Sequence, residues 1–167
     1  MSPALPFDPI EEARRQWVAR GWSTAAGGMA AVTSLMRAQQ IVLARIDRHL
    51  RPLGLTFARY EVLMLLMFSR RGALPLSVVG SRLQVHPTSV TSAVDRLESQ
   101  GLVRRSPHPT DRRAVLAELT PEGRDLAEQA SRRLNEEVFV DLGLDDSEAE
   151  QLVDVVRTLR RAEGDFA

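Results

Sequence analysis

The chain has 167 residues, of which 44% are hydrophobic, and it contains no cysteine. This length and composition predict one domain, or one domain with a dimerisation appendage, and exclude a disulfide framework. No run of about 18 apolar residues is present, so no transmembrane helix is expected. Asp8, Glu11 and Glu12 stand where a signal peptide would carry basic and apolar residues. The sequence therefore predicts a cytoplasmic protein that does not bind a membrane.

The formal net charge is zero, but the charges are unevenly distributed. Residues 1–119 carry 16 Arg and 9 acidic residues, whereas residues 120–167 carry 6 Arg and 13 acidic residues. Phosphates respond to the local field rather than to the net charge, so the basic part remains compatible with DNA binding. For the acidic part we favour the simpler interpretation of a solvated helix surface.

A short N-terminal helix is expected to begin at Asp8. This aspartate is a good helix cap, Pro9 takes the first helical position, and Glu11 follows three residues after the cap. The apolar face of the helix carries Trp17, and the helix is expected to end at Gly21.

A long helix is expected over Met29–Leu50. The small residues 23–28 before it predict a hinge, or else a weak first turn of the same helix. The apolar stripe of the long helix is wide enough for two burial surfaces, one against its own domain and one against a partner chain. Pro52 and Gly54 are expected to end it.

The next helix, Phe57 to Arg70, is apolar on nearly every side and is predicted to be the buried centre of the domain. Glu61 is the one acidic residue in this helix. An unpaired buried carboxylate is costly, so Glu61 is expected to have a partner. The candidate partners are Arg37, Arg45, His49 and Arg59.

Residues 74–84 are expected to form a short strand, Leu74 to Leu76, and then the first helix of a helix–turn–helix, Ser77 to Gln84. The second helix begins at His86, with a proline in its first position. Its apolar residues recur at the spacing of one narrow helical stripe, Val90, Val94 and Leu97.

Around that stripe lie short hydroxyl side chains at the start of the second helix and an arginine one turn further on. These residues are Thr88, Ser89, Ser92 and Arg96. Short side chains let the backbone approach the DNA major groove, hydroxyls bond phosphates or base edges, and arginine can bind guanine through two hydrogen bonds. The pattern indicates a DNA-reading helix, and we predict that these four residues contact DNA.

Gly101 is expected to end the second helix, and two paired strands follow over residues 102–105 and 114–119. By alternation, Arg104 and Arg105 lie on opposite faces of the first strand, so we expect one of them to contact phosphate and the other not. Both are candidate DNA-binding residues. The strands and their loop complete a winged helix–turn–helix.

The loop between the strands holds Asp111, Arg112 and Arg113. Arg112 or Arg113 can enter a narrow minor groove, where the negative potential attracts arginine. Asp111 is interpreted as a brace that holds the guanidinium of Arg113, because an isolated acid would be repelled by the phosphates. The alternative is a solvated charged loop with no role in binding.

Two further helices end the chain. Thr120 and Pro121 open the first, which is expected to run to about Val140, and Asp145 with Glu148 forms a capping box for the second. Because the DNA-binding module is already complete, the apolar stripes of these helices need another surface. Packing across a two-fold axis buries them and places two recognition helices about one DNA turn apart.

The segment VDRLESQGLVRRSPHPTDRRAVLAELTPEGRDL resembles the signature region of the MarR family, the multiple-antibiotic-resistance regulators. The resemblance runs from about Met29 to the last residue, and its DRR-to-TPEG part is specific to the family. It implies a DNA-binding transcriptional regulator, and it matches Asp111 and Arg113 to the paired wing residues of the family. The chain departs from the family pattern at Pro75, where a Ser or Thr cap is usual, and at Gln84, where glycine is common.

The resemblance also implies a ligand pocket between the long helix, the helix after it and the DNA-binding lobe. The Trp-bearing N-terminal extension is similar to that of urate-responsive members, where it helps to close the pocket. Alternatively, its tryptophans only pin the extension onto the dimer, and Glu61 forms a structural salt bridge or faces solvent. The candidate ligand-binding residues are Trp17, His49, Arg59 and Glu61.

Together these features predict a mainly α fold with a small β wing. An N-terminal extension (1–28) precedes a helical dimerisation region (29–55 and 120–167), which flanks a winged helix–turn–helix DNA-binding domain (56–119). The expected function is that of a dimeric, sequence-specific regulator of transcription, a repressor that a small anionic or phenolic ligand releases from double-stranded operator DNA.

Other classes of function are less well supported. One alternative is a ligand-independent winged-helix module that binds DNA architecturally or binds other proteins. An enzyme is not expected, because no cysteine and no Gly-rich phosphate loop are present. The three histidines, His49, His86 and His108, fall on different elements without metal-ligand spacing, so neither a metal nor a cofactor is expected.

Overall fold

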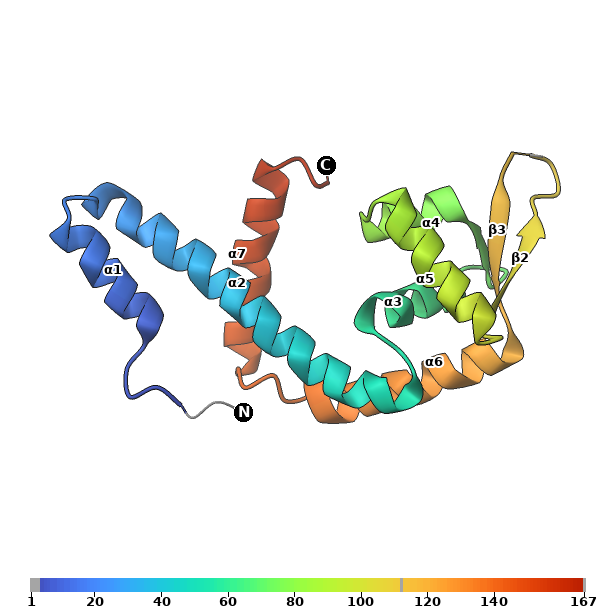
Figure 1. Cartoon of the computed structure of the whole chain (residues 1–167), viewed down its shortest axis with the longest axis horizontal. Coiled ribbons are helices and arrows are strands. Elements are labelled where there is room, and N and C mark those ends of the chain that lie inside the picture. Colours follow the sequence, from blue (N-terminus) through green and yellow to red (C-terminus); the bar gives the residue numbers. More distant parts are fainter. Residues whose placement is uncertain (1–3, 112, 167) are drawn as a thin grey trace. The chain divides into compact units, whose positions relative to one another are not determined.

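The computed structural model describes residues 4–111 and 113–166. They form two compact units, Met1–Phe57 and Ala58–Ala167, made of helices and one small antiparallel sheet (Figure 1). The α-helices are α1 Pro9–Ala19, α2 Ser23–Leu50, α3 Phe57–Met67, α4 Leu76–Leu83, α5 Pro87–Ser99, α6 Pro121–Leu134 and α7 Asp146–Ala162. The strands are β1 Ala73–Pro75, β2 Val103–Pro107 and β3 Val115–Leu119. The predicted fold class, mainly α with a small β wing, is confirmed.

In the first unit, α1 packs against α2. The predicted cap is present, since Asp8 Oδ1 accepts the backbone N–H of Ile10 at 2.8 Å and that of Glu11 at 3.4 Å. The turn between the helices is held by the aromatic pair Trp17 and Trp22, whose rings meet edge to face with centroids 5.3 Å apart. The N-terminal extension is thus a folded part of this unit.

The helix α2 begins at Ser23 and runs for 28 residues. The prediction of a hinge over residues 23–28 is therefore wrong, and the alternative prediction, that these residues form the first turn of the long helix, is confirmed. Alanine, the best helix former, offsets the cost of the two glycines, roughly 1 kcal/mol each, and Ala26 is buried. A 3₁₀ turn, Arg51–Leu53 (η1), ends the helix where Pro52 and Gly54 were expected to end it.

In the second unit, α3 carries a buried face formed by Tyr60, Val62, Leu63 and Leu66. The Tyr60 hydroxyl lies 3.0 Å from Ser131 Oγ, which joins α3 to α6. The helix ends at Met67 rather than at Arg70, because the N–H of Ser69 donates to the carbonyl of Leu66 at 3.0 Å and turns the chain.

The sheet has the strand order β1-β3-β2, and both pairings are antiparallel. The outer strand β1 lies one residue earlier than predicted, because Pro75 pairs with Leu116 and α4 begins immediately afterwards at Leu76. The wing hairpin pairs Val103 with Leu119 at its base and Pro107 with Val115 near its tip.

A close contact fixes α6 beside the base of the wing. Thr120 caps this helix by accepting the backbone N–H of Gly123 at 3.0 Å, and its hydroxyl donates to the carbonyl of Gly101 at 2.8 Å. A Cβ atom added to Gly123 would lie 2.0 Å from the carbonyl oxygen of Leu102. Only glycine fits this approach.

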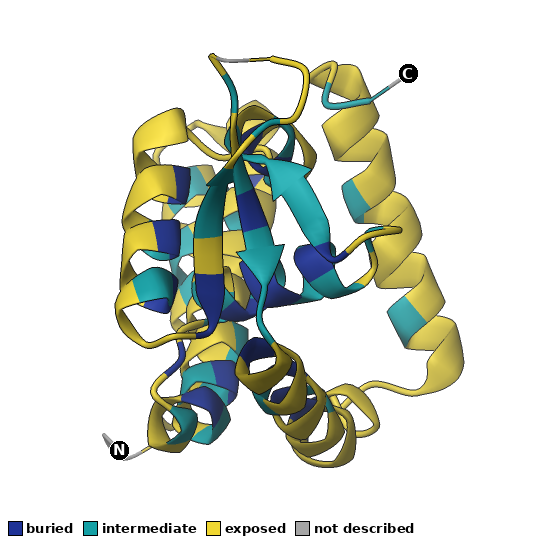
Figure 2. Cartoon of the chain, turned by 90° about the vertical axis from the view of Figure 1, so that its right-hand side faces the viewer, coloured by how far each residue is buried: buried dark blue, intermediate teal, exposed yellow. Residues whose placement is uncertain are grey.

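The two C-terminal helices have the predicted starts. A π-helical segment, Asn135–Phe139 (η2), carries the chain on from α6 to about the expected end at Val140. Asp145 and Glu148 form the predicted capping box of α7, with backbone-to-carboxylate distances of 2.8 and 2.9 Å. No residue of α7 is buried, and Figure 2 shows this helix exposed along nearly its whole length. None of the helices in the part of the chain that the structure describes combines the length and the apolar character that a membrane span requires.

Candidate nucleic-acid interface

The helix α5 divides into a buried and an exposed face, as predicted. Val90, Val94 and Leu97 are buried against the rest of the winged domain. Its partner helix α4 comes so close that a Cβ atom at Gly80 would lie 3.3 Å from a methyl group of Val90. The four candidate DNA-reading residues, Thr88, Ser89, Ser92 and Arg96, are all exposed. The structure therefore places them on the solvent side of α5.

The turn between α4 and α5 accounts for one departure from the family pattern. Gln84 has φ = +54°, the left-handed conformation that glycine adopts most easily. Its side-chain Nε2 donates to the carbonyl of Asp165 at 2.8 Å, and the next N–H, that of Val85, donates to the carbonyl of Gly80 at 3.1 Å. These hydrogen bonds hold a glutamine where a glycine is common.

The two arginines of β2 point to opposite faces, as the alternation predicted. Arg104 lies opposite Glu118 on β3, and its guanidinium is 2.7 Å from the Glu118 carboxylate. Glu118 also accepts a hydrogen bond from the Ser106 hydroxyl, and the bonds from Ser106 and Arg104 lower the pKa of the Glu118 carboxyl. Arg104 nevertheless keeps 74% of its side chain exposed.

Arg105 turns instead onto α5. Its guanidinium lies 2.5 Å from Asp95 Oδ1 and 2.6 Å from Glu98 Oε2. Its backbone N–H also donates to Glu98 Oε1 at 2.9 Å, and only 26% of the side chain is exposed. Two carboxylates of α5, the candidate recognition helix, therefore balance the charge of Arg105.

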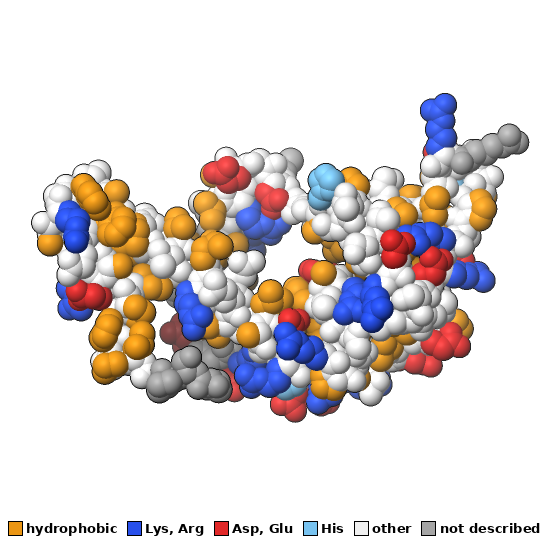
Figure 3. Space-filling view, viewed as in Figure 1, with side chains coloured by type: hydrophobic (Ala, Val, Ile, Leu, Met, Phe, Trp, Pro, Cys, Tyr) orange, Lys and Arg blue, Asp and Glu red, His pale blue; other side chains and the backbone are white. Residues whose placement is uncertain are grey.

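The wing loop is held together by short-range hydrogen bonds. Asp111 Oδ1 accepts the backbone N–H of Arg113 at 2.9 Å. The prediction that Asp111 holds the guanidinium of Arg113 is therefore wrong. The Asp111 carboxylate instead binds the main-chain N–H of Arg113. Arg113 is exposed, and Arg112 lies outside the described residues. In the space-filling view, a basic side chain stands out from the wing end (Figure 3).

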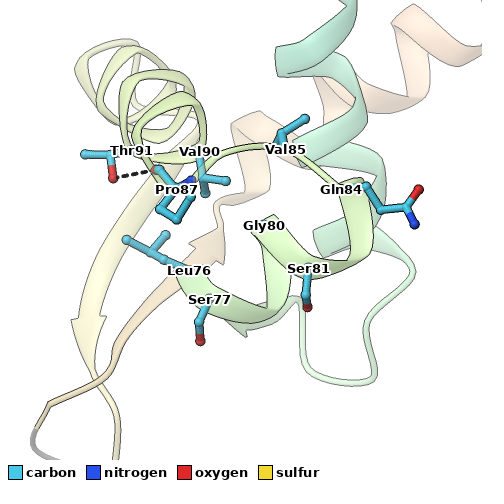
Figure 4. Close-up of a pocket in the computed structure, with 9 residues that line it drawn as sticks. All are labelled: Leu76, Ser77, Gly80, Ser81, Gln84, Val85, Pro87, Val90 and Thr91. Atoms are coloured by element: carbon cyan, nitrogen blue, oxygen red, sulfur yellow. Dashed lines mark hydrogen bonds between the residues drawn. The ribbon is translucent and has the colours of Figure 1, made fainter. Parts of the chain in front are cut away.

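A cavity of about 510 Å³ opens between α4 and α5 (Figure 4). Apolar groups form most of the wall of this cavity, and three hydroxyl side chains lie at its edge. The lining residues are Leu76, Ser77, Gly80, Ser81, Gln84, Val85, Pro87, Val90 and Thr91. The Thr91 hydroxyl donates to the carbonyl of Pro87 at 3.1 Å. The cavity therefore adjoins the first turns of the recognition helix.

The candidate ligand residues do not line this cavity. Trp17 and His49 are half-buried in the first unit, and Arg59 and Glu61 are half-buried in the second. Within the described residues of the second unit, the Glu61 carboxylate has no ion-pair partner, and burial raises its pKa above the ordinary value of 4.5. In the described part of the chain, no three metal-ligating side chains lie together.

Two of the three histidines, His86 at the predicted start of α5 and His108 in the wing loop, accept backbone N–H groups through Nδ1. His86 caps α5, since its Nδ1 accepts the backbone N–H of Thr88 at 3.3 Å. His108 Nδ1 accepts the backbone N–H of Asp111 in the wing loop at 3.1 Å. The signal that could have revealed both is a repeated His-Pro-Thr tripeptide.

Comparison with known proteins identifies relatives of this arrangement. Residues 55–115 match the model of the MarR family. Sco5413 of Streptomyces coelicolor, a MarR family transcriptional regulator, is 49% identical with a TM-score of 0.77, over 84% of this chain and 97% of Sco5413. CouR of Rhodococcus jostii RHA1, bound to p-coumaroyl-CoA, is 30% identical with a TM-score of 0.64, over 75% of this chain and 87% of CouR. A second structure, of the transcriptional repressor CouR on a 23-mer DNA duplex, has a TM-score of 0.70 at 26% identity, over 75% and 89% of the two chains.

A curated relative agrees with these structures. The transcriptional regulator MhqR of Bacillus subtilis is 34% identical over 89 residues, which are 53% of this chain. The chain spans 60% of the length of MhqR. The family model covers the helix–turn–helix and its wing loop, and the likeness to Sco5413 extends over nearly all of that protein. The chain therefore belongs to the MarR family of transcriptional regulators.

Proposed function

We propose that the protein is a dimeric, sequence-specific transcriptional regulator of the cytoplasm, a repressor that a small anionic or phenolic ligand releases from its operator. The observation that carries the proposal is the exposed face of α5, where Thr88, Ser89, Ser92 and Arg96 stand clear of the packed stripe. Hydroxyls at the start of a helix and an arginine one turn later suit the phosphates and base edges of a major groove.

The wing supplies the second contact in this proposal. Arg112 or Arg113 reaches the minor groove, where the negative potential attracts arginine. Arg113 is exposed, and Asp111 holds its backbone N–H. Of the two arginines on β2, exposed Arg104 is the phosphate contact. Arg105 is a positioning residue, because its guanidinium already binds two carboxylates of α5.

Dimerisation is supported by apolar side chains that the single chain leaves uncovered. In the first unit, Val32 and Met36 of α2 are 64% and 53% exposed. In the second unit, Val155 and Leu159 of α7 are 69% and 50% exposed. We assign residues 29–55 and 120–167 to a dimerisation region, residues 56–119 to DNA binding, and residues 1–28 to an extension. A second copy of the chain would bury these faces and set two recognition helices on one side of the duplex.

Ligand control is supported by CouR, which is bound to p-coumaroyl-CoA in one structure and to DNA in another. A ligand releases a repressor only if it binds the DNA-incompetent state more tightly than the competent one. Trp17, His49, Arg59 and Glu61 are the proposed ligand residues. The α4–α5 cavity is a second candidate location, because a ligand there would touch the recognition helix directly.

Two alternatives are weaker. A ligand-independent winged-helix module would use the same α5 and wing but would ignore small molecules. An enzyme is not proposed, because the relatives are regulators of transcription.

A gel-shift titration against the intergenic DNA that flanks the gene tests the proposal. It is run at two salt concentrations, with and without a panel of phenolic and carboxylate metabolites that includes urate. Tight, salt-sensitive binding that one compound abolishes is the expected result. Binding that no compound disturbs would favour the ligand-independent module, and the absence of any selective binding would contradict the proposed function.

A further inference from the structure

The tripeptide His-Pro-Thr occurs twice in the chain, at residues 86–88 and 108–110. The first copy opens α5, with Pro87 in the first position of the helix. The second copy lies in the loop between β2 and β3. The two copies thus occupy the recognition helix and the wing, the two elements to which the proposed function assigns DNA contacts.

Both copies adopt the same local hydrogen-bond pattern around the imidazole Nδ1 atom. His86 Nδ1 lies 3.3 Å from the backbone nitrogen of Thr88 and 3.1 Å from its hydroxyl. His108 Nδ1 lies 3.3 Å from both the backbone nitrogen and the hydroxyl of Thr110, and 3.1 Å from the backbone nitrogen of Asp111. The proline between histidine and threonine has a fixed φ, which limits the freedom of the turn.

This pattern determines where each ring carries its proton. A backbone N–H can only donate, so Nδ1 must accept and therefore has no proton. A neutral imidazole has one donor and one acceptor nitrogen, so this geometry favours the tautomer with the proton on Nε2 in both histidines. Within residues 4–111 and 113–166, neither Nε2–H has an acceptor. His86 is exposed and His108 is partly exposed, so both donors remain available to another molecule.

We propose that His86 and His108 are DNA-binding residues whose Nε2–H groups donate to phosphate oxygens of the operator. The inference rests on the proposed function and adds two contacts to it. Phosphate oxygens accept hydrogen bonds and do not donate them, and such contacts fix the register of a protein on the duplex. The two donors are held in place by the same acceptor bonds that cap α5 and close the wing loop. In each element, one histidine therefore both shapes the local fold and contacts the DNA backbone.

Two pairs of variants separate the cap from the donor. Asparagine places an acceptor near the position of Nδ1 and has nothing at the position of Nε2, whereas glutamine places a donor near Nε2 and lacks the cap. His86→Asn and His108→Asn should therefore keep the thermal unfolding temperature of the parent protein. Each should weaken operator binding by between about two- and tenfold for every hydrogen bond lost. His86→Gln and His108→Gln should bind DNA more tightly than the matching asparagine variants, and their unfolding temperature should fall.

The salt dependence distinguishes a neutral donor from a cation. At about pH 8 an ordinary imidazole is mostly neutral. A neutral donor displaces no counterion from the DNA, so its removal leaves the number of counterions released on binding unchanged. The slope of log affinity against log salt should therefore be the same for the parent protein and for the asparagine variants. Long-range ¹H–¹⁵N correlation spectra of the imidazole rings should show protonated Nε2 and unprotonated Nδ1 for His86 and His108 in the free protein.

Two results would overturn this inference while leaving the proposed function intact. One is a pair of asparagine variants that bind operator as the parent protein does. The other is a ring spectrum with the proton on Nδ1 of both histidines. If the parent protein itself shows no preference for operator DNA, the proposed function fails and this inference fails with it.

Discussion

Arg105 and Glu98 are joined twice: the Arg105 backbone N–H donates to Glu98 Oε1 at 2.9 Å, and the guanidinium lies 2.6 Å from Oε2. The same guanidinium lies 2.5 Å from Asp95. The first strand of the wing is therefore tied to the last turns of the recognition helix. This link fixes the angle between the two elements that are proposed to contact DNA.

The first prediction concerns this link. Arg105→Ala should lower the free energy of unfolding by roughly 1 kcal/mol, a modest value because the ion pair is partly exposed. Operator affinity should fall because α5 and the wing lose their fixed geometry. The slope of log affinity against log salt should stay unchanged, because the Arg105 charge is already balanced within the chain. Urea unfolding and anisotropy titrations at several salt concentrations measure both effects. A slope reduced by about one ion would show instead that Arg105 contacts a phosphate.

The second prediction concerns the wing tip. Arg113→Ala should weaken operator binding and reduce the salt slope by about one ion, since a phosphate-neutralising cation is lost. Arg15→Ala is a matched control, because it removes an exposed arginine on α1, outside the proposed interface. Unchanged affinity and slope for Arg113→Ala would remove the wing from the DNA contact.

The third prediction concerns the close contact at the start of α6. Gly123→Ala should destabilise the fold by about 1–3 kcal/mol or more, because its Cβ meets a backbone carbonyl that cannot move freely. Gly28→Ala provides the control, since among the described residues no atom outside the neighbouring helix backbone lies within 4 Å of a Cβ added there. That variant should be neutral or more stable, by up to about 1 kcal/mol. Thermal unfolding of both variants checks the pair, and equal unfolding temperatures would contradict the contact.

The fourth prediction concerns Glu61. Burial raises the pKa of this carboxyl above 4.5, so the folded state binds its proton more tightly than the unfolded state does. The stability that this group contributes is therefore present at low pH and is lost as the pH rises through the folded pKa. Glu61→Gln should remove this loss and make the protein more stable at neutral pH. Unfolding curves across the acidic to neutral range test the sign, and a less stable variant at neutral pH would indicate a favourable partner for the charge.

The fifth prediction concerns the N-terminal extension. Trp17→Ala removes the edge-to-face contact with Trp22, 5.3 Å between centroids. If the extension closes a ligand pocket, operator affinity should persist while release by the ligand weakens. A gel-shift titration with the effective compound measures this difference. Loss of dimer with no separate effect on ligand release would show that the tryptophans only pin the extension.

Local patterns predicted the local structure well. The stripe of Val90, Val94 and Leu97 on α5 and the capping box of Asp145 and Glu148 depend on residues a few positions apart, and both are confirmed. The prediction of a hinge before the long helix was wrong, because the local composition is compatible with two structures. Residues 23–28 are small, and small residues suit a hinge and an alanine-rich helical turn equally well.

The contacts of the candidate site were harder to predict, because they join residues whose distance in space the sequence does not determine. The alternation of β2 separated Arg104 from Arg105, but it could not show that Arg105 binds Asp95 and Glu98 on another element. Asp111 was predicted to bind the guanidinium of Arg113, whereas a short turn brings its carboxylate to the backbone N–H of Arg113. Periodicity identifies a face, and the partner on that face depends on tertiary packing.

The exposed face of α5 is proposed to read a DNA sequence. The most direct measurement is fluorescence anisotropy of the purified protein with DNA from the flanking intergenic region and with shuffled DNA of the same length. At physiological salt, we expect the affinity for the intergenic DNA to be at least about 10³-fold higher than that for the shuffled DNA. We also expect Arg96→Ala to reduce this ratio. Equal affinity for both duplexes at every salt concentration would show that α5 does not read a DNA sequence.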